Sequence, residues 1–261
     1  MKKTIYFLFI FASFFLSYAQ DDTKSTNIRV KNEASERILF IVSNAHFYGE
    51  LERSTSNHFS EIVHAYDVFK KAGYSMDFVS PEGGAIPIGY INTSDSLQKK
   101  YLYDNDFMDV LEDTQAPSEI RASDYLAVYY GGGGAAMFGV ADNKAIQRIA
   151  MQVYENQGGV ISTICHGTAG IVNLQTKDGS YLVTGKKVNG FPDAFENMEA
   201  DYYKTFPFSI QQKIIERGGD FQFSKEGWDD FYMADGRLIT GQDPSAAASV
   251  ARKVVETLQR L

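Results

Sequence analysis

The chain has one cysteine in 261 residues, so it cannot form an internal disulfide bond. Runs of basic residues are missing too, and the formal net charge is −8, which argues against nucleic-acid binding through phosphates. Internal repeats and low-complexity tracts are absent from the sequence. After the N-terminal region, no segment is apolar and long enough to span a bilayer. The chain contains 19 Phe and 16 Tyr residues, which indicate a protein with a packed globular core.

The first residues, MKKTIYFLFIFASFFLSYAQ, have the order of a secretory signal peptide. Two lysines precede an apolar run, and small residues follow it before Ala19. A membrane anchor is the alternative, but the run is shorter than the roughly 20 residues that a spanning helix needs. We therefore expect a signal peptide at 1–19, a flexible polar leader at 20–36, and export to the periplasm or the medium.

The remaining segment, 37–261, is long enough for one sizeable domain. Apolar runs that predict strands alternate with amphipathic segments that predict helices. Strands are expected at 37–44, 75–84, 124–134, 160–164, 220–224 and 231–242. Helices are expected at 60–74, 106–114, 142–159, 207–219 and 244–261, and a further helix begins at 167. This alternation predicts a parallel sheet with helices on both faces, and 85–123 forms a cap or insertion.

Two loops are predicted at the carboxyl ends of the strands, where ligands bind in such sheets. The first is the glycine run 131–134, and the second is Cys165-His166-Gly167. The order I-C-H-G between a strand and a helix has the shape of a nucleophile elbow. Backbone amides at a helix start would lower the pKa of the Cys165 thiol and favour the nucleophilic thiolate. A small buried hydrophobic residue is the alternative for Cys165, and a structural role is the alternative for His166.

The glycine run predicts either an oxyanion site built from backbone amides or a flexible turn. It is not a G-x-G-x-x-G pattern, which argues against dinucleotide binding. Three carboxylates are candidates for catalytic groups: Glu61, Glu196 and Glu199. The alternative is a favourable charge in the first turn of a helix for Glu61 and a position on the surface for the other two. Three histidines raise the question of a metal, but no H-E-x-x-H or C-x-x-C pattern supports a metal site: His46, His58 and His64.

Five stretches together resemble the ThiJ/PfpI superfamily of the class I glutamine amidotransferase-like fold. They are SEIVHAYDVFKKAGYSMDFVSPEGG, DFMDVLEDTQAPSEIRASDYLAVYYGGGG, ISTICHGTAG, VTGKKVNGFPDAFE and DGRLITGQDPSAAA. The resemblance covers nearly all of 37–258 and is greatest to the branch of stress-inducible chaperones and glyoxalase III proteins. It implies a flavodoxin-like three-layer α/β/α sandwich with a mostly parallel sheet, a nucleophile elbow and a small cap insertion.

The resemblance also implies roles for individual residues. Cys165 matches the elbow nucleophile, and His166 matches the histidine that follows it in this branch. Glu61 matches the carboxylate that approaches the cysteine sulfur, and Glu196 matches the third member of the triad-like set. The amides of Gly132 and Gly133, with that of His166, match the oxyanion site.

The sequence departs from the branch at three places. The branch usually carries a histidine inside the glycine loop, whereas this loop is all glycine. Gly139 stands where an aspartate is usual, and Phe195 precedes Glu196 in place of a glutamate or glycine. These departures leave the substrate contacts of the loop and the local shape around Glu196 open.

The function that the resemblance implies is the cofactor-free conversion of methylglyoxal to lactate, with no metal. A small dicarbonyl such as methylglyoxal would be the substrate, unfolded or glycated proteins would be further partners, and the protein would be a homodimer. One alternative is a thiol hydrolase, a peptidase or amidase using Cys165, His166 and Glu196. Another is a non-catalytic chaperone or redox sensor whose low-pKa thiol is reversibly oxidised.

Overall fold

A six-stranded sheet forms the centre of the part of the chain that the computed structural model describes, namely Met1 and residues 36–261. The expected signal peptide and leader lie almost entirely outside these residues. The strands run in the order β3 (Ser75–Val79), β1 (Arg37–Ile41), β5 (Tyr125–Tyr130), β6 (Val160–Ile164), β10 (Leu238–Gly241) and β9 (Tyr232–Asp235). All neighbours pair in parallel except β9 and β10, which form an antiparallel hairpin at one edge. The expected mostly parallel sheet is confirmed.

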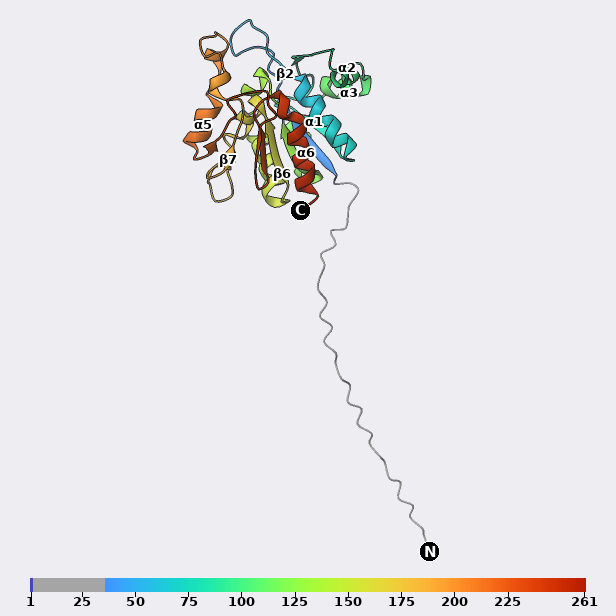
Figure 1. The fold of residues 1–261 in the computed structure, drawn as a ribbon. Coiled ribbons are helices and arrows are strands. Elements are labelled where there is room, and N and C mark those ends of the chain that lie inside the picture. Colours follow the sequence, from blue (N-terminus) through green and yellow to red (C-terminus); the bar gives the residue numbers. More distant parts are fainter. Residues whose placement is uncertain (2–35) are drawn as a thin grey trace. The chain divides into compact units, whose positions relative to one another are not determined.

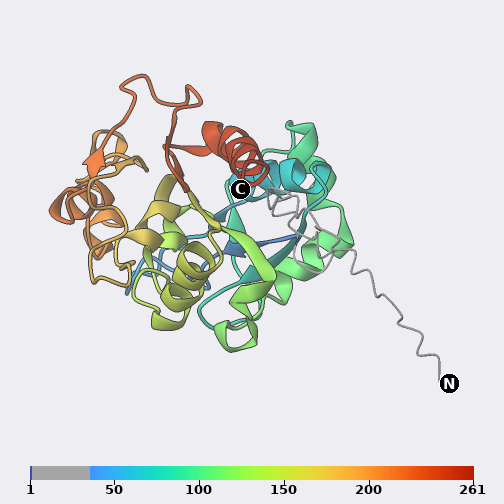
Figure 2. The same ribbon diagram turned by 90° about the horizontal axis from the view of Figure 1, so that it is seen from below.

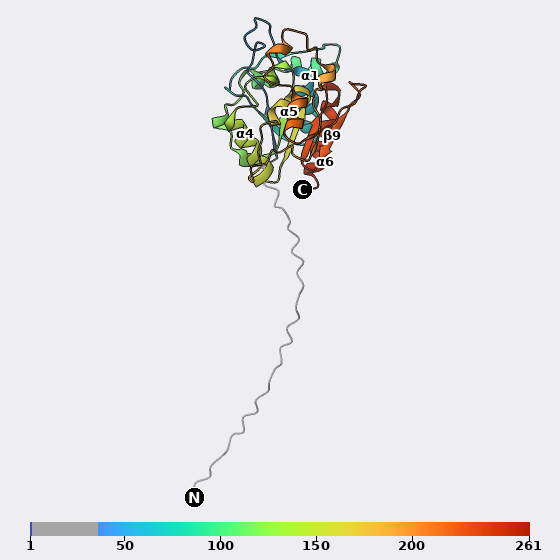
Figure 3. The ribbon, with the colours of Figure 1, turned by 90° about the vertical axis from the view of Figure 1, so that its left-hand side faces the viewer.

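Helices cover both faces of this sheet, as Figures 1 and 2 show. One face carries α1 (Phe59–Lys71) and α6 (Ala247–Leu258), with α2 (Ser96–Leu102) and α3 (Asn105–Glu112) next to α1. The other face carries α4 (Lys144–Met151) and α5 (Ile210–Glu216). Figure 3 shows α4 and α6 on opposite flanks of the sheet. The result is the three-layer sandwich that the resemblance predicted.

Strand β1 shows why two layers of helices are needed. Ile38 and Phe40 belong to the apolar cluster under α1 and α6, whereas Leu39 and Ile41 belong to the cluster under α4. Successive side chains of a strand point to opposite faces, so a continuous apolar strand must be covered on both. Phe40 is fully buried and stacks on Phe78 with ring centroids 4.7 Å apart.

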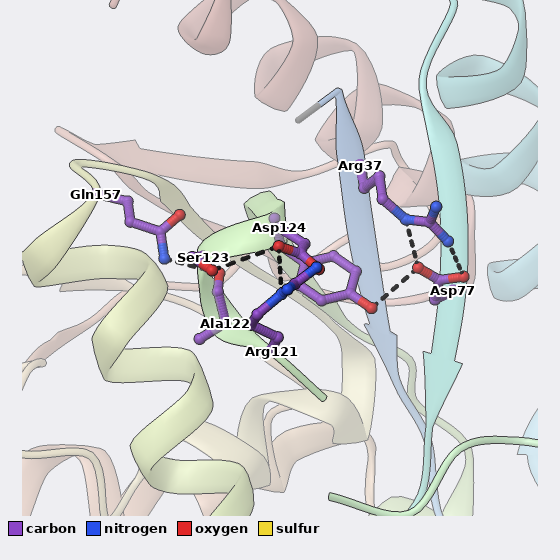
Figure 4. A network of polar contacts seen from close by, with 8 residues as sticks. Arg37, Asp77, Arg121, Ala122, Ser123, Asp124 and Gln157 are labelled. Carbon is purple, nitrogen blue, oxygen red and sulfur yellow. Dashed lines mark hydrogen bonds and ion pairs between the residues drawn. The ribbon is translucent and has the colours of Figure 1, made fainter. Parts of the chain in front are cut away.

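Polar contacts tie together the amino ends of three strands (Figure 4). The Asp77 carboxylate on β3 accepts from Arg37 Nε at 2.7 Å and from Tyr125 Oη at 2.9 Å. Arg121 pairs with Asp124 just before β5. These contacts occupy the edge opposite to the carboxyl ends of the strands. The polar groups at the carboxyl ends therefore have no part in this structural network.

Several predicted boundaries were wrong. The helix expected at 142–159 is α4 followed by a π-helical turn, Gln152–Asn156. The segment expected to begin a helix at 167 is a 3-10 helix, Cys165–Ile171, and it contains two glycines, which have low helix propensity. The strand expected at 220–224 is the short β8 (Asp220–Phe221), which pairs with β7 (Lys187–Val188) outside the main sheet.

The segment 85–123 forms the expected insertion, with β4 (Ile88–Gly89), α2, α3 and two 3-10 turns. Strand β4 pairs with β2 (Asn57–His58), which directly precedes α1. This pairing brings the start of the insertion to the carboxyl edge of the sheet. Within the described part of the chain, no helix is long and apolar enough to cross a membrane.

Candidate active site

Cys165 lies on a strained turn directly after β6. Its φ angle is +54°, in the left-handed region that residues other than glycine rarely adopt. The following turn packs tightly on β5, because a Cβ atom at Gly167 would lie 2.4 Å from the carbonyl oxygen of Tyr130. The residue thus has the geometry of a nucleophile elbow, held by the close approach of two backbones.

Glu61, in the first turn of α1, is fully buried beside this elbow. Its Oε2 atom accepts the backbone N–H of Gly132 at 2.8 Å. A Cβ atom at Gly132 would lie 2.6 Å from this oxygen and 3.0 Å from Cys165 Cβ, so no larger residue fits. The glycine loop therefore holds the Glu61 carboxyl next to the cysteine by a hydrogen bond.

This bond uses the Gly132 amide, which was expected to donate to an oxyanion. That expectation is corrected, because the amide donates to Glu61.

Burial favours the neutral forms of both groups. Burial raises the pKa of Glu61 to about 8, and the Gly132 amide and the Cys165 thiol only partly offset this effect. Burial also raises the pKa of the Cys165 thiol well above its ordinary value, and the Glu61 carboxyl raises it further. The prediction of a lowered thiol pKa was therefore wrong. The amide of His166 does lower it, but a single short 3-10 turn does not outweigh burial and a neighbouring carboxyl.

His166 connects the thiol to a second carboxylate. Its Nδ1 atom lies 3.3 Å from Cys165 Sγ, and its Nε2 atom lies 2.7 Å from Glu196 Oε1. An ionised carboxylate can only accept, so Glu196 favours the tautomer with the proton on Nε2. Nδ1 then faces the sulfur with its lone pair. The Phe191 ring stacks on the imidazole at 4.6 Å and fixes its plane.

The structure thus brings together Cys165, His166, Glu61 and Glu196, and places Gly133 in the wall of the same cavity. Glu199 is exposed and does not line it. Of the histidines considered for a metal, only His58 lines the cavity, where burial lowers its pKa to about 4. No cluster of three or more His, Cys, Asp or Glu side chains in the described residues could hold a metal ion.

The cavity has a volume of about 370 Å³, and most of its wall was not anticipated from the sequence. Tyr90, from the insertion, has a φ angle of +55° and stacks on His58 with centroids 4.6 Å apart. Its hydroxyl lies 3.4 Å from that of Tyr48. The sequence carries no periodic signal for these contacts, because Tyr90 follows a two-residue strand inside the insertion. The cavity is lined by Tyr48, Arg53, His58, Tyr90, Gly133, Gly134, Cys165, His166, Phe191, Phe195, Glu196, Tyr202, Phe206, Trp228 and Pro244.

The all-glycine loop has no room for the histidine that the family branch usually carries. A Cβ atom at Gly133 would lie 2.4 Å from the carbonyl oxygen of Ser56. At Gly134 it would lie 2.5 Å from the Tyr48 hydroxyl oxygen and from Thr55 Oγ1. Neighbouring segments pack closely against Gly133 and Gly134, so neither position has room for a side chain.

The third departure, Phe195 before Glu196, leaves the carboxylate in contact with His166. Phe195 packs against the exposed Trp228 with ring centroids 5.9 Å apart, and Glu196 still reaches His166. The local shape therefore differs in its aromatic wall and not in the contact between imidazole and carboxylate.

The described residues thus form a mostly parallel α/β sandwich in which a cysteine elbow faces a buried glutamate. Residues 58–257 match the DJ-1/PfpI family, and the chain belongs to this family. The chain is 31% identical over 209 residues to the glutathione-independent glyoxalase HSP31 of Saccharomyces cerevisiae, covering 76% of this chain and 87% of that protein. It is also 31% identical over 213 residues to glyoxalase 3 of Candida albicans, covering 76% and 88%.

Solved structures agree with this assignment. The crystal structure of glyoxalase III from Candida albicans superposes with a TM-score of 0.73 at 28% identity, covering 85% of this chain and 96% of that one. The Rapid Encystment Protein 24 kDa of Francisella tularensis superposes with a TM-score of 0.79 at 25% identity, covering 85% and 98%. The family and the fold class expected from the sequence are confirmed.

Alkylation by iodoacetamide tests the mutual effect of Glu61 and Cys165, and the chain's single cysteine makes the signal specific. The rate should rise with pH with a midpoint above 9.0, because burial and Glu61 both raise the thiol pKa. In Glu61→Gln the midpoint should fall, because the carboxyl no longer opposes the thiolate. The exposed Glu216→Gln variant is the matched control and should behave as the parent. A parent midpoint near neutrality would contradict the electrostatics described above.

Proposed function

We propose that this protein converts methylglyoxal to lactate through a nucleophilic cysteine and without a cofactor, as a glyoxalase III of the D-lactate dehydratase type. The observation that carries the proposal is the buried Glu61 carboxyl, with its pKa raised to about 8, lying against the only thiol of the chain. A base for carbon-bound protons works best with a pKa near the working pH. The names of the two relatives, both 31% identical to this chain, also support it.

The first step is addition of the thiol to the aldehyde. Cys165 Sγ forms a bond to the aldehyde carbon, and the electron pair of the C=O bond moves to the oxygen. His166 Nδ1, 3.3 Å from the sulfur, takes the thiol proton and passes it to that oxygen. The product is a hemithioacetal. Glu196 holds the imidazole from its other nitrogen and stabilises its positive charge.

The second step moves hydrogen between the two carbons. Ionised Glu61 removes the hydrogen from the carbon bonded to sulfur, and the electron pair moves through the new C=C bond to the ketone oxygen. The amides of Gly133 and His166 donate to this oxyanion. Glu61 then returns the proton to the second carbon, while His166 carries the hydroxyl proton of the first carbon to the second oxygen. The product is a lactoyl thioester on Cys165.

The third step is hydrolysis of the thioester. His166 removes a proton from water as the water oxygen attacks the carbonyl carbon, and the C–S bond breaks with return of the proton to sulfur. Lactate leaves and the thiol is restored. The sum of the steps consumes one methylglyoxal and one water, and requires no external oxidant or reductant.

A thiol hydrolase is the second candidate, because Cys165, His166 and Glu196 form a continuous chain of contacts of the kind that activates nucleophiles. Glu61 does not belong to this series of contacts. Loss of Glu61 would therefore remove the hydrogen transfer of a glyoxalase but leave ester or amide hydrolysis possible. A redox sensor is less well supported, since such sensors depend on a lowered thiol pKa, and the pKa of Cys165 is raised.

Homodimer formation and action on unfolded or glycated proteins are further proposals that come from the family resemblance. So is export, which the basic, apolar and small residues of 1–19 support. If the segment is a signal peptide cleaved after Ala19, the N-terminal residue of protein recovered from the periplasm or medium should be Gln20. Mass spectrometry of the intact chain measures this, and a retained Met1 on exported protein would contradict it.

Substitutions at the two central residues test the proposed reaction. Cys165→Ser should abolish lactate formation from methylglyoxal, and Glu61→Gln should lower kcat by about 100-fold or more, because each loses a group that the chemistry needs. Lactate is measured enzymatically, with Glu216→Gln as control. Full activity in Cys165→Ser would exclude the mechanism. Loss of lactate formation in Glu61→Gln with unchanged hydrolysis of a p-nitrophenyl ester would identify Glu61 as specific to hydrogen transfer.

The pH dependence of kcat/KM tests Glu61 as the carbon base. Glu61 must be ionised to remove the hydrogen, and its raised pKa leaves it mostly protonated at neutral pH. The value of kcat/KM for methylglyoxal should therefore rise with pH and level off above about 8. Initial rates of methylglyoxal loss across this range provide the profile. A rising limb at the ordinary glutamate pKa of about 4.3 would show that another group is the base.

A further inference from the structure

The cavity above Cys165 is much larger than methylglyoxal, which consists of one aldehyde, one ketone and one methyl group. Its volume of about 370 Å³ falls in the range of roughly 300–1,000 Å³ that accommodates drug-sized ligands. Seven of its fifteen lining residues are Phe, Tyr or Trp. A wall of this composition favours a planar, apolar group, because aromatic side chains bury large areas and stack on other rings.

One permanent positive charge lies in the same wall, on the exposed residue Arg53. The backbone of this residue closes a turn, since its carbonyl oxygen accepts the N–H of Tyr48 at 3.0 Å, and a bridge joins Phe47 to Ser54. The guanidinium group lies 4.9 Å from the centre of the Tyr202 ring. The turn and the contact with the ring place the guanidinium at the cavity wall, where it is open to solvent and to ligands.

No carboxylate of the described residues neutralises this guanidinium by an ion pair. Glu50 and Glu52 are on the same turn but do not pair with it. The carboxylate in the cavity wall, Glu196, contacts His166. Arg53 therefore keeps its donors for another acceptor, and guanidinium groups match carboxylates with two parallel hydrogen bonds.

We infer that the cavity is a subsite for an α-oxoaldehyde whose substituent is a planar apolar group ending in a carboxylate, with the carboxylate bound by Arg53. This rests on the proposed function for the identity of the reacting group. The aldehyde lies over Cys165, the planar group lies among the aromatic side chains, and the acid faces the turn that carries Arg53. Methylglyoxal would then fill only the reacting end of the site.

Binding of unreactive probes tests this subsite without any need for turnover. Trp228 is the only tryptophan of the chain and lines the cavity, so its fluorescence reports occupancy. The probes are 3-phenylpropanoate and its neutral amide, 3-phenylpropanamide. The parent should bind the acid about tenfold more tightly than the amide, the size expected of one charge-assisted contact at a partly exposed site. Arg53→Gln should bind both with similar Kd values.

Arg148→Gln, on α4 and outside this cavity, makes the same change of charge and should keep the preference for the acid. Equal binding of acid and amide by the parent, no response to either, or a preference that survives Arg53→Gln would overturn the inference. Lactate formation from methylglyoxal is measured separately. If it is absent while Arg53 still governs the preference, the proposed function fails and the anionic subsite stands.

Discussion

The rest of the site depends on the burial of one carboxyl, that of Glu61, between the amide of Gly132 and the thiol of Cys165. A buried carboxylate with few hydrogen-bond donors is costly, and the Oε1 atom of Glu61 has no partner among the described residues. The group responds by holding its proton, so its pKa rises to about 8. The missing side chain at Gly132 and the left-handed turn at Cys165 are what allow this close arrangement.

The electrostatics of the site follow from the topology of the sheet. The loops after β5, β6 and β10 meet at one edge, and the last of them adds the fully buried Asp243, which raises the pKa of both Glu61 and Cys165. In this buried region an ionised Glu61 carboxyl opposes ionisation of the adjacent Cys165 thiol. A resting neutral thiol, activated only when a neighbouring base takes its proton, is less exposed to oxidation than a permanent thiolate.

Much of this arrangement could be predicted from the sequence, because local signals and family resemblance agreed. Strand β6 was predicted at its observed bounds, since a glycine pair ends the preceding segment and the elbow follows directly. The prediction of a lowered thiol pKa was wrong, because burial and the Glu61 carboxyl of α1 outweigh the effect of the amide that follows Cys165. Tyr90 and Arg53 could not be found, since both reach the cavity from irregular segments whose position is set by tertiary packing.

Chemistry and recognition come from different parts of this fold. The groups proposed to react lie on α1, on the turn after β6 and just past a 3-10 turn. Glu61 and Cys165 are buried, His166 and Glu196 are partly buried, and short contacts connect them. Cys165, His166 and Glu196 line one part of the cavity, and surface segments supply other parts, including the turn at Arg53, the insertion at Tyr90 and the loop at Trp228. Surface segments can vary without disturbing a buried hydrogen-bond network. Changes in these segments can therefore alter the substituent that the cavity accepts, and the unpaired guanidinium of Arg53 is the feature that we propose to set this preference.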